Sequence, residues 1–136
     1  MNRLMIGSLA KQANVNVETI RYYERRRLLA KPMRTRAGYR IYDTDALRRV
    51  RFIKHAQALG FSLKDIQELL ALRATPGGSS AEVRKRADAR IADIDEKLRV
   101  LQGMKNTLTR ITKTCRGRSL ISDCPILQCL DHERAS

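Results

Sequence analysis

Apolar side chains near the start of the chain recur every three or four positions, which predicts two short helices separated by a polar break. The first apolar stripe comprises Ile6, Leu9, Ala10 and Ala13. The stretch 14–16 interrupts it, and Asn16 is a helix-capping residue type because its side-chain oxygen accepts an orphan backbone amide. The second stripe comprises Val17, Ile20 and Tyr23. Together they indicate a helix-turn-helix, a pattern that many small helical domains share.

A glycine among strand-forming residues follows Pro32 and predicts a hairpin in place of a helix. Gly38 is flanked by Tyr39, Ile41 and Tyr42, so "RTRAGYRIYDTD" is typical of a short β-hairpin, or wing. The basic residues around it are Lys31, Arg34, Arg36 and Arg40. The alternative is a solvated loop.

Two further helices are expected after the hairpin, which makes the fold class mainly α. Asp43 or Thr44 is positioned to cap a third helix that ends at Gly60. Ser62 and Asp65 have the spacing of a capping box for a fourth helix. The apolar residues of these helices are Leu47, Val50, Ile53 and Ala58 in the third, and Leu63, Ile66, Leu69, Leu70 and Leu72 in the fourth.

A composition break at "ATPGGSS" (74–80) precedes the longest predicted helix. Ser79 and Glu82 form a capping box, and the helix is expected to run to about Thr114. Its apolar seam comprises Ala87, Ile91, Ile94, Leu98, Leu101, Met104, Leu108 and Ile111, a heptad pattern with one slip. A helix of about 34 residues is a rod of roughly 50 Å, so we expect a second copy of the chain to cover the seam in a coiled-coil dimer. The alternative is that the seam packs back on the N-terminal helices.

Lysine and arginine outnumber aspartate and glutamate by 28 to 14, which gives a net charge of +14 at pH 7. The excess lies mostly in residues 1–60, with 14 basic and four acidic side chains. It favours a polyanionic partner, most commonly nucleic acid, although charge alone does not separate DNA from RNA or an anionic membrane. No stretch is apolar enough for a signal peptide or a membrane span, so we expect a cytoplasmic protein without a membrane partner.

Arginines and tyrosines crowd the second helix in the stretch "RYYERRR" (21–27). Arginine forks onto guanine edges or phosphates, and tyrosine hydroxyls donate to phosphate oxygens. Because consecutive positions cannot share one helix face, some must be buried, and we expect Ile20 and Tyr23 in the core. For Tyr22 or Tyr23, a packing role is as good an interpretation as a contact with DNA. Arg21 is the best candidate for contact with the duplex.

These motifs together resemble the MerR family of bacterial transcription regulators. The stretches that carry the resemblance are "IGSLAKQANVNVETIRYYERRRLL", the wing "RTRAGYRIY" and "LRRVRFIKHAQALGFSLKDIQELLAL". The resemblance implies a homodimer of two winged helix-turn-helix domains joined by an antiparallel coiled coil. Family members bind a palindrome in double-stranded promoter DNA. The palindrome lies between the two elements that RNA polymerase recognises, and the spacer between these elements is too long. The effector-bound dimer distorts that DNA so that bacterial RNA polymerase can open it.

The resemblance also implies particular site residues. The DNA contacts it places on this sequence are Arg21 and Tyr23 in the recognition helix, and Arg34, Tyr39, Arg40 and Tyr42 around the wing. We therefore expect a winged helix-turn-helix DNA-binding domain at 1–75, a linker and coiled-coil dimerisation helix at 76–114, and an effector-binding loop with a short C-terminal helix at 115–136.

All three cysteines lie in the last part of the chain, at Cys115, Cys124 and Cys129. An odd number of thiols without export features indicates reduced cysteines in place of a disulfide framework. Two thiolates suit a soft metal ion, although a free cysteine is often just a small buried hydrophobe. With the family resemblance, metal sensing by Cys115 and Cys124 is the leading interpretation. Cys129 is expected to be a packing residue, with a third ligand or an oxidation partner as the alternative.

The choice of metal depends on a cysteine that this sequence lacks. The resemblance implies that sensors of divalent ions such as mercury or zinc carry another cysteine at the start of the long helix, where this chain has Ser79 and Ser80. The copper, silver and gold branch has serine there, which favours Cu(I) or Ag(I). The eight residues between Cys115 and Cys124 resemble the mercury and zinc branch, which leaves Hg(II) or another divalent ion open. Either serine alternatively serves only as a helix cap.

The leading hypothesis is therefore a metal-responsive DNA-binding activator without catalysis. A thiol-based redox or electrophile sensor is the second hypothesis, because Arg116 and Arg118 beside Cys115 favour a thiolate. An enzyme with a nucleophilic cysteine is not expected, because neither His55 nor His132 has an evident orienting partner. The operator and the regulated genes are not given by the sequence.

Overall fold

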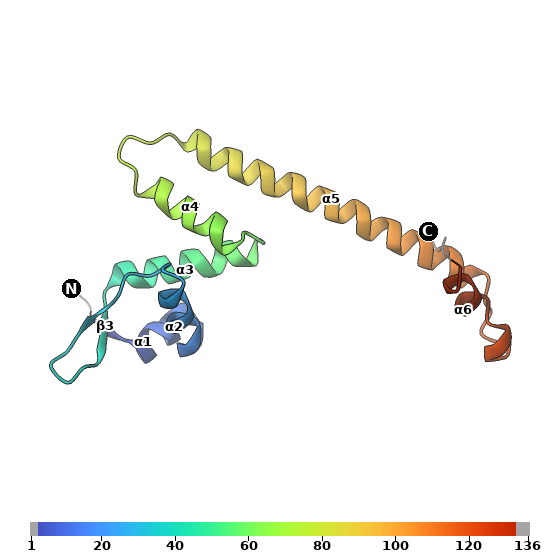
Figure 1. The fold of residues 1–136 in the computed structure, drawn as a ribbon, viewed down its shortest axis with the longest axis horizontal. Helices are drawn as coiled ribbons and strands as arrows, with labels where there is room; N and C mark the ends of the chain where they lie inside the picture. The colour runs from blue at the N-terminus through green and yellow to red at the C-terminus, as the bar shows by residue number, and fades with distance from the viewer. Residues whose placement is uncertain (1–2, 133–136) are drawn as a thin grey trace. The chain divides into compact units, whose positions relative to one another are not determined.

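The computed structural model describes residues 3–132 and is mainly helical, as the apolar spacing predicted (Figure 1). Its elements are β1 (Leu4–Met5), α1 (Ile6–Ala13), α2 (Val17–Arg25), β2 (Met33–Arg34), β3 (Arg40–Tyr42), α3 (Thr44–Ala58), α4 (Leu63–Arg73), α5 (Ser80–Lys113), the 3-10 turn η1 (Ile121–Asp123) and α6 (Pro125–Leu130). The chain divides into two compact units, the first up to Val83 and the second from Arg84. The ends of the first and last predicted domains, 1–2 and 133–136, lie outside the described residues.

The helix-turn-helix forms as predicted, with its turn closed by local hydrogen bonds. Asn16 Oδ1 accepts the N–H of Thr19 at 2.8 Å and so caps α2. Asn14 ends α1 in the left-handed conformation, with φ of 57°. Lys54 Nζ, from α3, donates to the carbonyl oxygen of Asn14 at 3.0 Å. A basic side chain of α3 therefore binds the negative end of α1 and fixes the turn in place.

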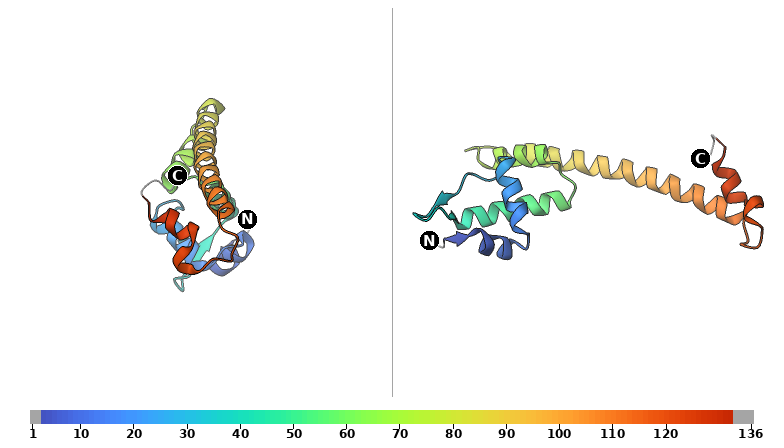
Figure 2. Two further views of the ribbon diagram at one scale, coloured as in Figure 1. Left: turned by 90° about the vertical axis from the view of Figure 1, so that its right-hand side faces the viewer. Right: turned by 60° about the horizontal axis from the view of Figure 1, so that its bottom comes forward.

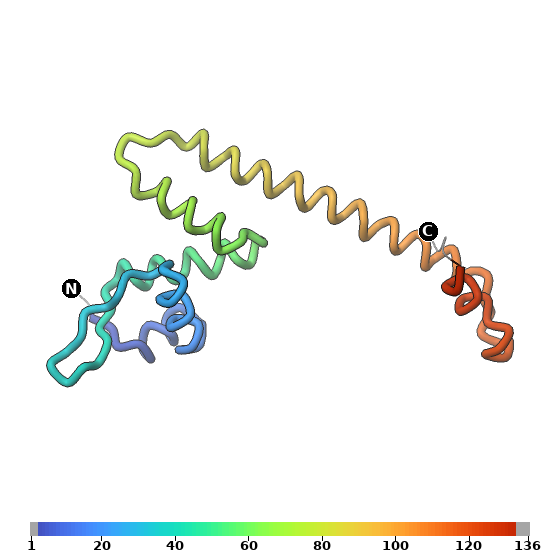
Figure 3. Tube along the Cα trace, viewed as in Figure 1, coloured from blue at the N-terminus to red at the C-terminus, as the bar shows by residue number. Residues whose placement is uncertain are grey.

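The predicted hairpin is present, and a strand that the apolar pattern does not predict joins it. β2 pairs antiparallel with β3, and β1 pairs with the other edge of β3, so the strand order is β1-β3-β2. The tight turn at the tip is visible in the chain trace of Figure 3. There the N–H of Gly38 donates to the carbonyl oxygen of Thr35 at 2.9 Å. Gly38 has φ of 87°, a conformation that favours glycine, so the residue that marked the hairpin in the sequence also shapes it.

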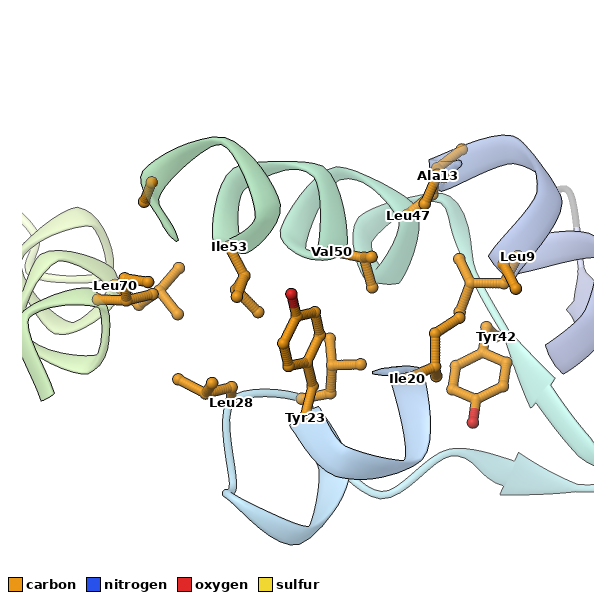
Figure 4. Close-up of a cluster of buried hydrophobic side chains, with 14 residues drawn as sticks. Leu9, Ala13, Ile20, Tyr23, Leu28, Tyr42, Leu47, Val50, Ile53 and Leu70 are labelled. Carbon is orange, nitrogen blue, oxygen red and sulfur yellow. The ribbon is translucent and has the colours of Figure 1, made fainter. Parts of the chain in front are cut away.

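One apolar core holds the helices and the wing of the first unit together. Its most deeply buried side chains are Leu9, Ile20, Leu28, Val50, Ile53 and Ile66. Figure 4 shows Ile20 and Tyr23 of α2 directed toward α3, which contributes Val50 and Ile53. The pair expected in the core, Ile20 and Tyr23, is therefore confirmed as buried, with 0% and 2% of the residue exposed.

The third and fourth helices begin at the predicted caps. Asp43 Oδ1 accepts the N–H of Ala46 at 2.9 Å at the start of α3. Ser62 and Asp65 form both hydrogen bonds of the predicted capping box at the start of α4. Gly60 lies between the two helices with φ of 88°, which ends the first of them.

α5 is one unbroken helix (Figure 2), and it has 34 residues. Its predicted seam is exposed. At its start, the Ser79 hydroxyl oxygen accepts the N–H of Ala81 at 3.1 Å. Of the α5 residues, all of which the structure describes, only Ile111 is buried. The other large seam residues are 38–59% exposed, and they are Ile91, Ile94, Leu98, Leu101, Met104 and Leu108. Within the described part of the chain, no helix is both long and apolar enough to cross a membrane.

Candidate nucleic-acid interface and cysteine loop

The outer face of α2 carries an arginine and tyrosine surface. Glu18, Arg21, Tyr22 and Arg25 are spaced three, one and three residues apart, and all four are exposed. Arg21 Nη1 lies 2.5 Å from Glu18 Oε1, and the guanidinium of Arg25 lies 5.9 Å from the centre of the Tyr22 ring. These contacts orient two guanidinium groups on one face of the helix. Arg21, the leading sequence candidate for the duplex, is thus placed where DNA can reach it.

Tyr23 lies on the opposite, buried face of α2. Its hydroxyl donates to Gln57 Oε1 of α3 at 2.7 Å, and burial raises the pKa of Tyr23 above its usual value. The resemblance implied a DNA contact for Tyr23, but its side chain is inside the core of the first unit. The exposed tyrosine of the pair is Tyr22.

The wing presents two arginines side by side. Arg34 of β2 stands directly opposite Arg40 of β3 in the antiparallel register. Like charges in this position destabilise a strand pair, and the Glu24 carboxylate, 3.4 Å from Arg40 Nε, offsets part of that repulsion. Arg34 Nη1 also donates to the carbonyl oxygen of Gly38 at 2.8 Å, which directs it along the wing toward the tip. Tyr39, next to that glycine, is 63% exposed.

Tyr42, in contrast, is a core residue of the wing. It is 4% exposed, and its hydroxyl donates a short hydrogen bond to Glu24 Oε1 of α2. Burial raises the pKa of Tyr42, and the hydrogen bond to the Glu24 carboxylate raises it further. The implied DNA contact at Tyr42 is therefore replaced in this structure by a contact between the wing and α2.

Two features of this surface were missed by the sequence reasoning. Tyr22 and Arg25 were not assigned to it, although their spacing from Glu18 and Arg21 follows one helix face and was readable from the sequence. Glu24 was missed because its partners lie in β3, and no local pattern predicts a contact across that distance. The described DNA-facing candidates are therefore Arg21, Tyr22, Arg25, Arg34, Tyr39 and Arg40.

In the second unit, the chain turns back at the end of α5 and brings the first cysteine to a defined position. The N–H of Cys115 donates to the carbonyl oxygen of Thr112 at 3.2 Å, which closes the last turn. The N–H of Gly117 then points at Cys115 Sγ at 3.4 Å, with Gly117 in the left-handed region at φ of 73°. The Gly117 amide is therefore a hydrogen-bond donor to the Cys115 sulfur.

The second cysteine is the residue that precedes α6. The N–H of Cys124 donates to the carbonyl oxygen of Ile121 at 3.1 Å, and its own carbonyl oxygen accepts from Gln128 at the same distance. Its side chain makes no capping hydrogen bond, so the thiol is available to a ligand. The short helix expected after Pro125 is present as α6. Figure 2 shows η1 and α6 folded back at the C-terminal end of α5.

A single buried side chain shows that this loop is packed. Ile111 is 3% exposed, whereas Leu108, one turn earlier on the seam, is 55% exposed. A helix surface residue is covered only by atoms outside its own helix, and residues 114–132 are the described part of the second unit outside α5. We therefore attribute the burial of Ile111 to this loop. Cys115 and Cys124 are both half-buried within it.

The described part of the chain shows no metal site of three or more donors around the thiols. All three cysteines are free and half-buried. In residues 3–132, no group of three or more His, Cys, Asp or Glu side chains is placed to hold a metal ion. The structure therefore gives no support for Cys129 as a third ligand, and His132 is exposed. Two soft sulfur donors are the set that Cu(I), Ag(I) or Hg(II) accepts, whereas Zn(II) usually takes four ligands.

Comparison with known proteins adds a family assignment to this geometry. The family model described as MerR HTH family regulatory protein matches residues 4–72, and the model described as MerR, DNA binding matches residues 47–111. The HTH-type transcriptional regulator ZntR of Escherichia coli K12 is 38% identical over 128 residues, which cover 93% of this chain and 91% of that protein.

Two further proteins are similar along nearly the whole chain. The mercuric resistance operon regulatory protein of Serratia marcescens is 39% identical over 134 residues, which cover 98% of this chain and 92% of that protein. The structure of the transcription regulator PbrR691 from Ralstonia metallidurans CH34 in complex with lead(II) superposes with a TM-score of 0.83 at 34% identity. The match covers 93% of this chain and 99% of that one.

Proposed function

Because the chain belongs to the MerR family of helix-turn-helix transcription regulators, we propose that it is a metal-responsive activator of transcription in the bacterial cytoplasm. Members of this family are regulators and not enzymes. The observation that carries the proposal is that Cys115 and Cys124 are free, half-buried thiols at the two ends of the loop that closes α5. Thiolates are soft ligands, so thiols gathered at one place favour a soft metal ion as the effector.

The DNA-binding part of the proposal rests on the first unit. Its arginines lie on the outer face of α2 and on the wing, at Arg21 and Arg25 and at Arg34 and Arg40. Arginine on a recognition helix reads guanine or phosphate, and arginine on a wing neutralises the backbone. We propose that these residues, with Tyr39 at the tip, bind each half of a palindromic promoter site.

The exposed seam of α5 supports a homodimer. Six large apolar side chains between Ile91 and Leu108 are 38–59% exposed on one heptad stripe. An apolar stripe of this length is stabilised when a second helix with the same stripe packs against it. The proposed dimer is the antiparallel coiled coil of the family, and it brings two helix-turn-helix units to the two halves of one site.

We propose that the effector is a soft ion held by two thiolates, with Cu(I) or Ag(I) favoured. Two thiolates and a monovalent ion leave a net charge of −1, and monovalent coinage metals accept two-coordination. Ser79 and Ser80 stand where the divalent branches of the family carry a further cysteine. The Ser79 hydroxyl oxygen accepts the N–H of Ala81, so this position caps the helix and has no sulfur ligand.

Hg(II) is the second candidate, and a different observation favours it. Eight residues separate Cys115 from Cys124, the spacing of the mercury-type branch, and a 39% identical relative is named for a mercuric resistance operon. Hg(II) also accepts two thiolates. When both cysteines bind one ion, the loop 116–123 is fixed at its two ends, and this is the change that we propose is passed to the promoter DNA. RNA polymerase would then open a promoter whose spacing the distorted DNA has corrected.

A metal titration of the purified, reduced protein tests the proposal. Ag(I), Hg(II), Pb(II) and Zn(II) are added in turn, with a competing chelator, and thiolate-to-metal absorption is followed. We expect one ion for each pair of thiols in a chain, with Ag(I) or Hg(II) binding far more tightly than Zn(II). Tight Zn(II) or Pb(II) binding with more than two protein donors would overturn the two-thiolate proposal. Cysteine oxidation by peroxide that activates transcription without any metal would favour the redox alternative.

A further inference from the structure

The carboxylate of Glu24 lies between the recognition helix and the wing. Glu24 is on α2, and both of its partners are on β3. Tyr42 donates its hydroxyl to Oε1 in a short hydrogen bond, and Arg40 Nε lies 3.4 Å from Oε2. Each oxygen of one carboxylate is therefore directed at a different residue of the same strand.

Placing a carboxylate here is costly for a DNA-binding surface. The Glu24 side chain is only 11% exposed, so it has lost most of its hydration. It is also one of only four acidic residues in residues 1–60, on the helix proposed to approach phosphates. Its charge alone would repel DNA, so a role in binding must come from what it holds.

The Glu24 carboxylate links the two proposed DNA-binding elements, α2 and the wing. Arg34 and Arg40 stand opposite each other in β2 and β3, so fixing β3 also fixes the position of Arg34. The Nε atom of Arg40 faces Glu24, while 30% of the Arg40 side chain is exposed. Arg40 can therefore contact Glu24 and a DNA phosphate at the same time. β3 also packs against β1, α1 and α3, and the Glu24 carboxylate adds polar contacts that join β3 directly to α2.

We propose that Glu24 is a positioning residue that locks the wing to the recognition helix, so that Arg21 and Arg34 meet the same duplex at once. The proposal rests on the proposed DNA binding and adds to it a residue that touches no DNA itself. Preorganising two contact elements lowers the entropy lost on binding and favours the duplex on which both fit. Loss of the lock should therefore reduce specific binding more than non-specific binding.

Two substitutions break the lock in different ways, and two others are matched controls. Glu24→Gln removes the charge that faces Arg40, and Tyr42→Phe removes the hydroxyl donor but keeps the ring in the core. Tyr23→Phe is the control for the hydrogen bond, because it removes a buried tyrosine hydroxyl from α2 that faces α3 and not the wing. Asp45→Asn is the control for charge, because Asp45 is an exposed acidic residue of the first unit.

The measurement is the dissociation constant for two duplexes at several salt concentrations, by fluorescence anisotropy with full-length protein. One duplex is selected from a random pool by the unmodified protein, and the other is an unrelated sequence of equal length. We expect each of the two substitutions to weaken binding of the selected duplex by roughly tenfold, because Glu24→Gln loses the ion pair with Arg40 and Tyr42→Phe loses the hydrogen bond to the carboxylate. The slope of log K against log salt should also become shallower, because wing phosphate contacts are lost.

The double variant Glu24→Gln/Tyr42→Phe should bind about as weakly as either single variant, since both break one lock. Tyr23→Phe and Asp45→Asn should keep the parent salt slope and the parent ratio of selected to unrelated affinity. Thermal melting of each variant confirms that the fraction folded is that of the parent at the assay temperature.

The sign of the Glu24→Gln effect makes the experiment decisive. Removing a negative charge beside DNA strengthens binding if charge is all that matters. Equal or tighter binding of the selected duplex by Glu24→Gln, with an unchanged affinity ratio, would overturn the positioning role. Equal weakening on both duplexes would do so too, because it would reflect stability only. If the unmodified protein selects no duplex, the proposed DNA binding itself is wrong, a result distinct from either of these.

Discussion

The hydroxyl of Tyr23 donates a 2.7 Å hydrogen bond to Oε1 of Gln57, which joins the recognition helix α2 to α3 at the edge of the core. Gln57 lies near the end of α3, and Tyr23 is 2% exposed. The contact therefore adds a hydrogen bond to the apolar packing of α2 against α3.

Replacing Tyr23 with phenylalanine should lower the free energy of unfolding by about 1 kcal/mol, because the hydrogen bond from the buried phenol to the Gln57 oxygen is lost. Urea unfolding followed by circular dichroism measures the change. Tyr39→Phe is the matched control, since Tyr39 is 63% exposed at the wing and its hydroxyl can remain in water. A loss of similar size in both variants would show that the Gln57 contact is not its source.

Stability should fall on the alkaline side, and the buried tyrosines set the direction. Burial raises the pKa of Tyr23 and of Tyr42 above the usual 10.0. Below that value both phenols are neutral in the folded and unfolded chains, so their contribution to stability is fully present. Above it the unfolded chain loses the protons first, and stability is lost as pH rises toward the folded pKa values.

The test compares the unfolding free energy of the parent and Tyr42→Phe at about pH 9 and about pH 11, a range that brackets the tyrosine transition of the unfolded chain. Lysines titrate in this range in both proteins, so only the difference between them reports Tyr42. The parent should lose more stability than the variant. Identical losses would mean that Tyr42 is not protected from ionisation.

The cap of the recognition helix should carry a measurable share of stability. Asn16→Ala removes the oxygen that accepts from the N–H and the hydroxyl of Thr19, both at 2.8 Å. We expect a loss of about 1 kcal/mol in the free energy of unfolding, measured by urea titration. Asn16→Asp keeps an acceptor at the same place and should retain most of it. An unchanged Asn16→Ala protein would mean that the cap is replaced by water.

The exposed seam of α5 should hold the dimer together. Leu98 is on the seam and 58% exposed, and Val100 is off the seam and 48% exposed. Leu98→Lys should raise the dimer dissociation constant by more than about tenfold, because it buries an unpaired charge at the interface. Val100→Lys, two residues along, should leave it nearly unchanged. Sedimentation velocity across a concentration series measures both, and equal effects would contradict a dimer formed through this seam.

The two proposed thiolate ligands should be separable from the third cysteine. Cys115→Ser and Cys124→Ser should each weaken metal binding by more than about 100-fold, since even outer-shell changes cost up to that much. Cys129→Ser should bind the metal as the parent does. All three should bind promoter DNA without metal, because the thiols lie in the second unit and the arginines in the first. Loss of metal binding in Cys129→Ser would make it a ligand after all.

The helix starts show what local chemistry makes predictable. Asn16 and Ser62 were assigned as caps from residue type and spacing, and Asp43 was one of two candidates with Thr44. Each of the three accepts the backbone N–H three residues later. A cap needs only its own helix to form its hydrogen bond, so the sequence contains all of the information. The exposed seam of α5 and the short helix after Pro125 were predictable for the same reason.

The tyrosines show where that reasoning ends. Residue type and helical period placed Tyr23 in the core, while the family resemblance implied DNA contacts at Tyr23 and Tyr42, and both side chains are buried. β1 was missed because it forms only by pairing with β3, which lies nearly forty residues further along the chain. Neither a strand of two residues nor a buried hydroxyl has a local signature strong enough to read.

The sequence by itself determined the helices and their caps, the glycine turn of the wing, the basic first half, the apolar seam and the gathering of all thiols after α5. These depend on neighbours within about one helical turn or on composition, and so survive without any knowledge of packing. Tertiary structure alone decided that Tyr42 faces the core, that Glu24 joins the recognition helix to the wing, and that Ile111 is covered. The contacts of Tyr42 with Glu24 and of Tyr23 with Gln57 join residues 18 or more positions apart, and only a folded domain brings such groups together.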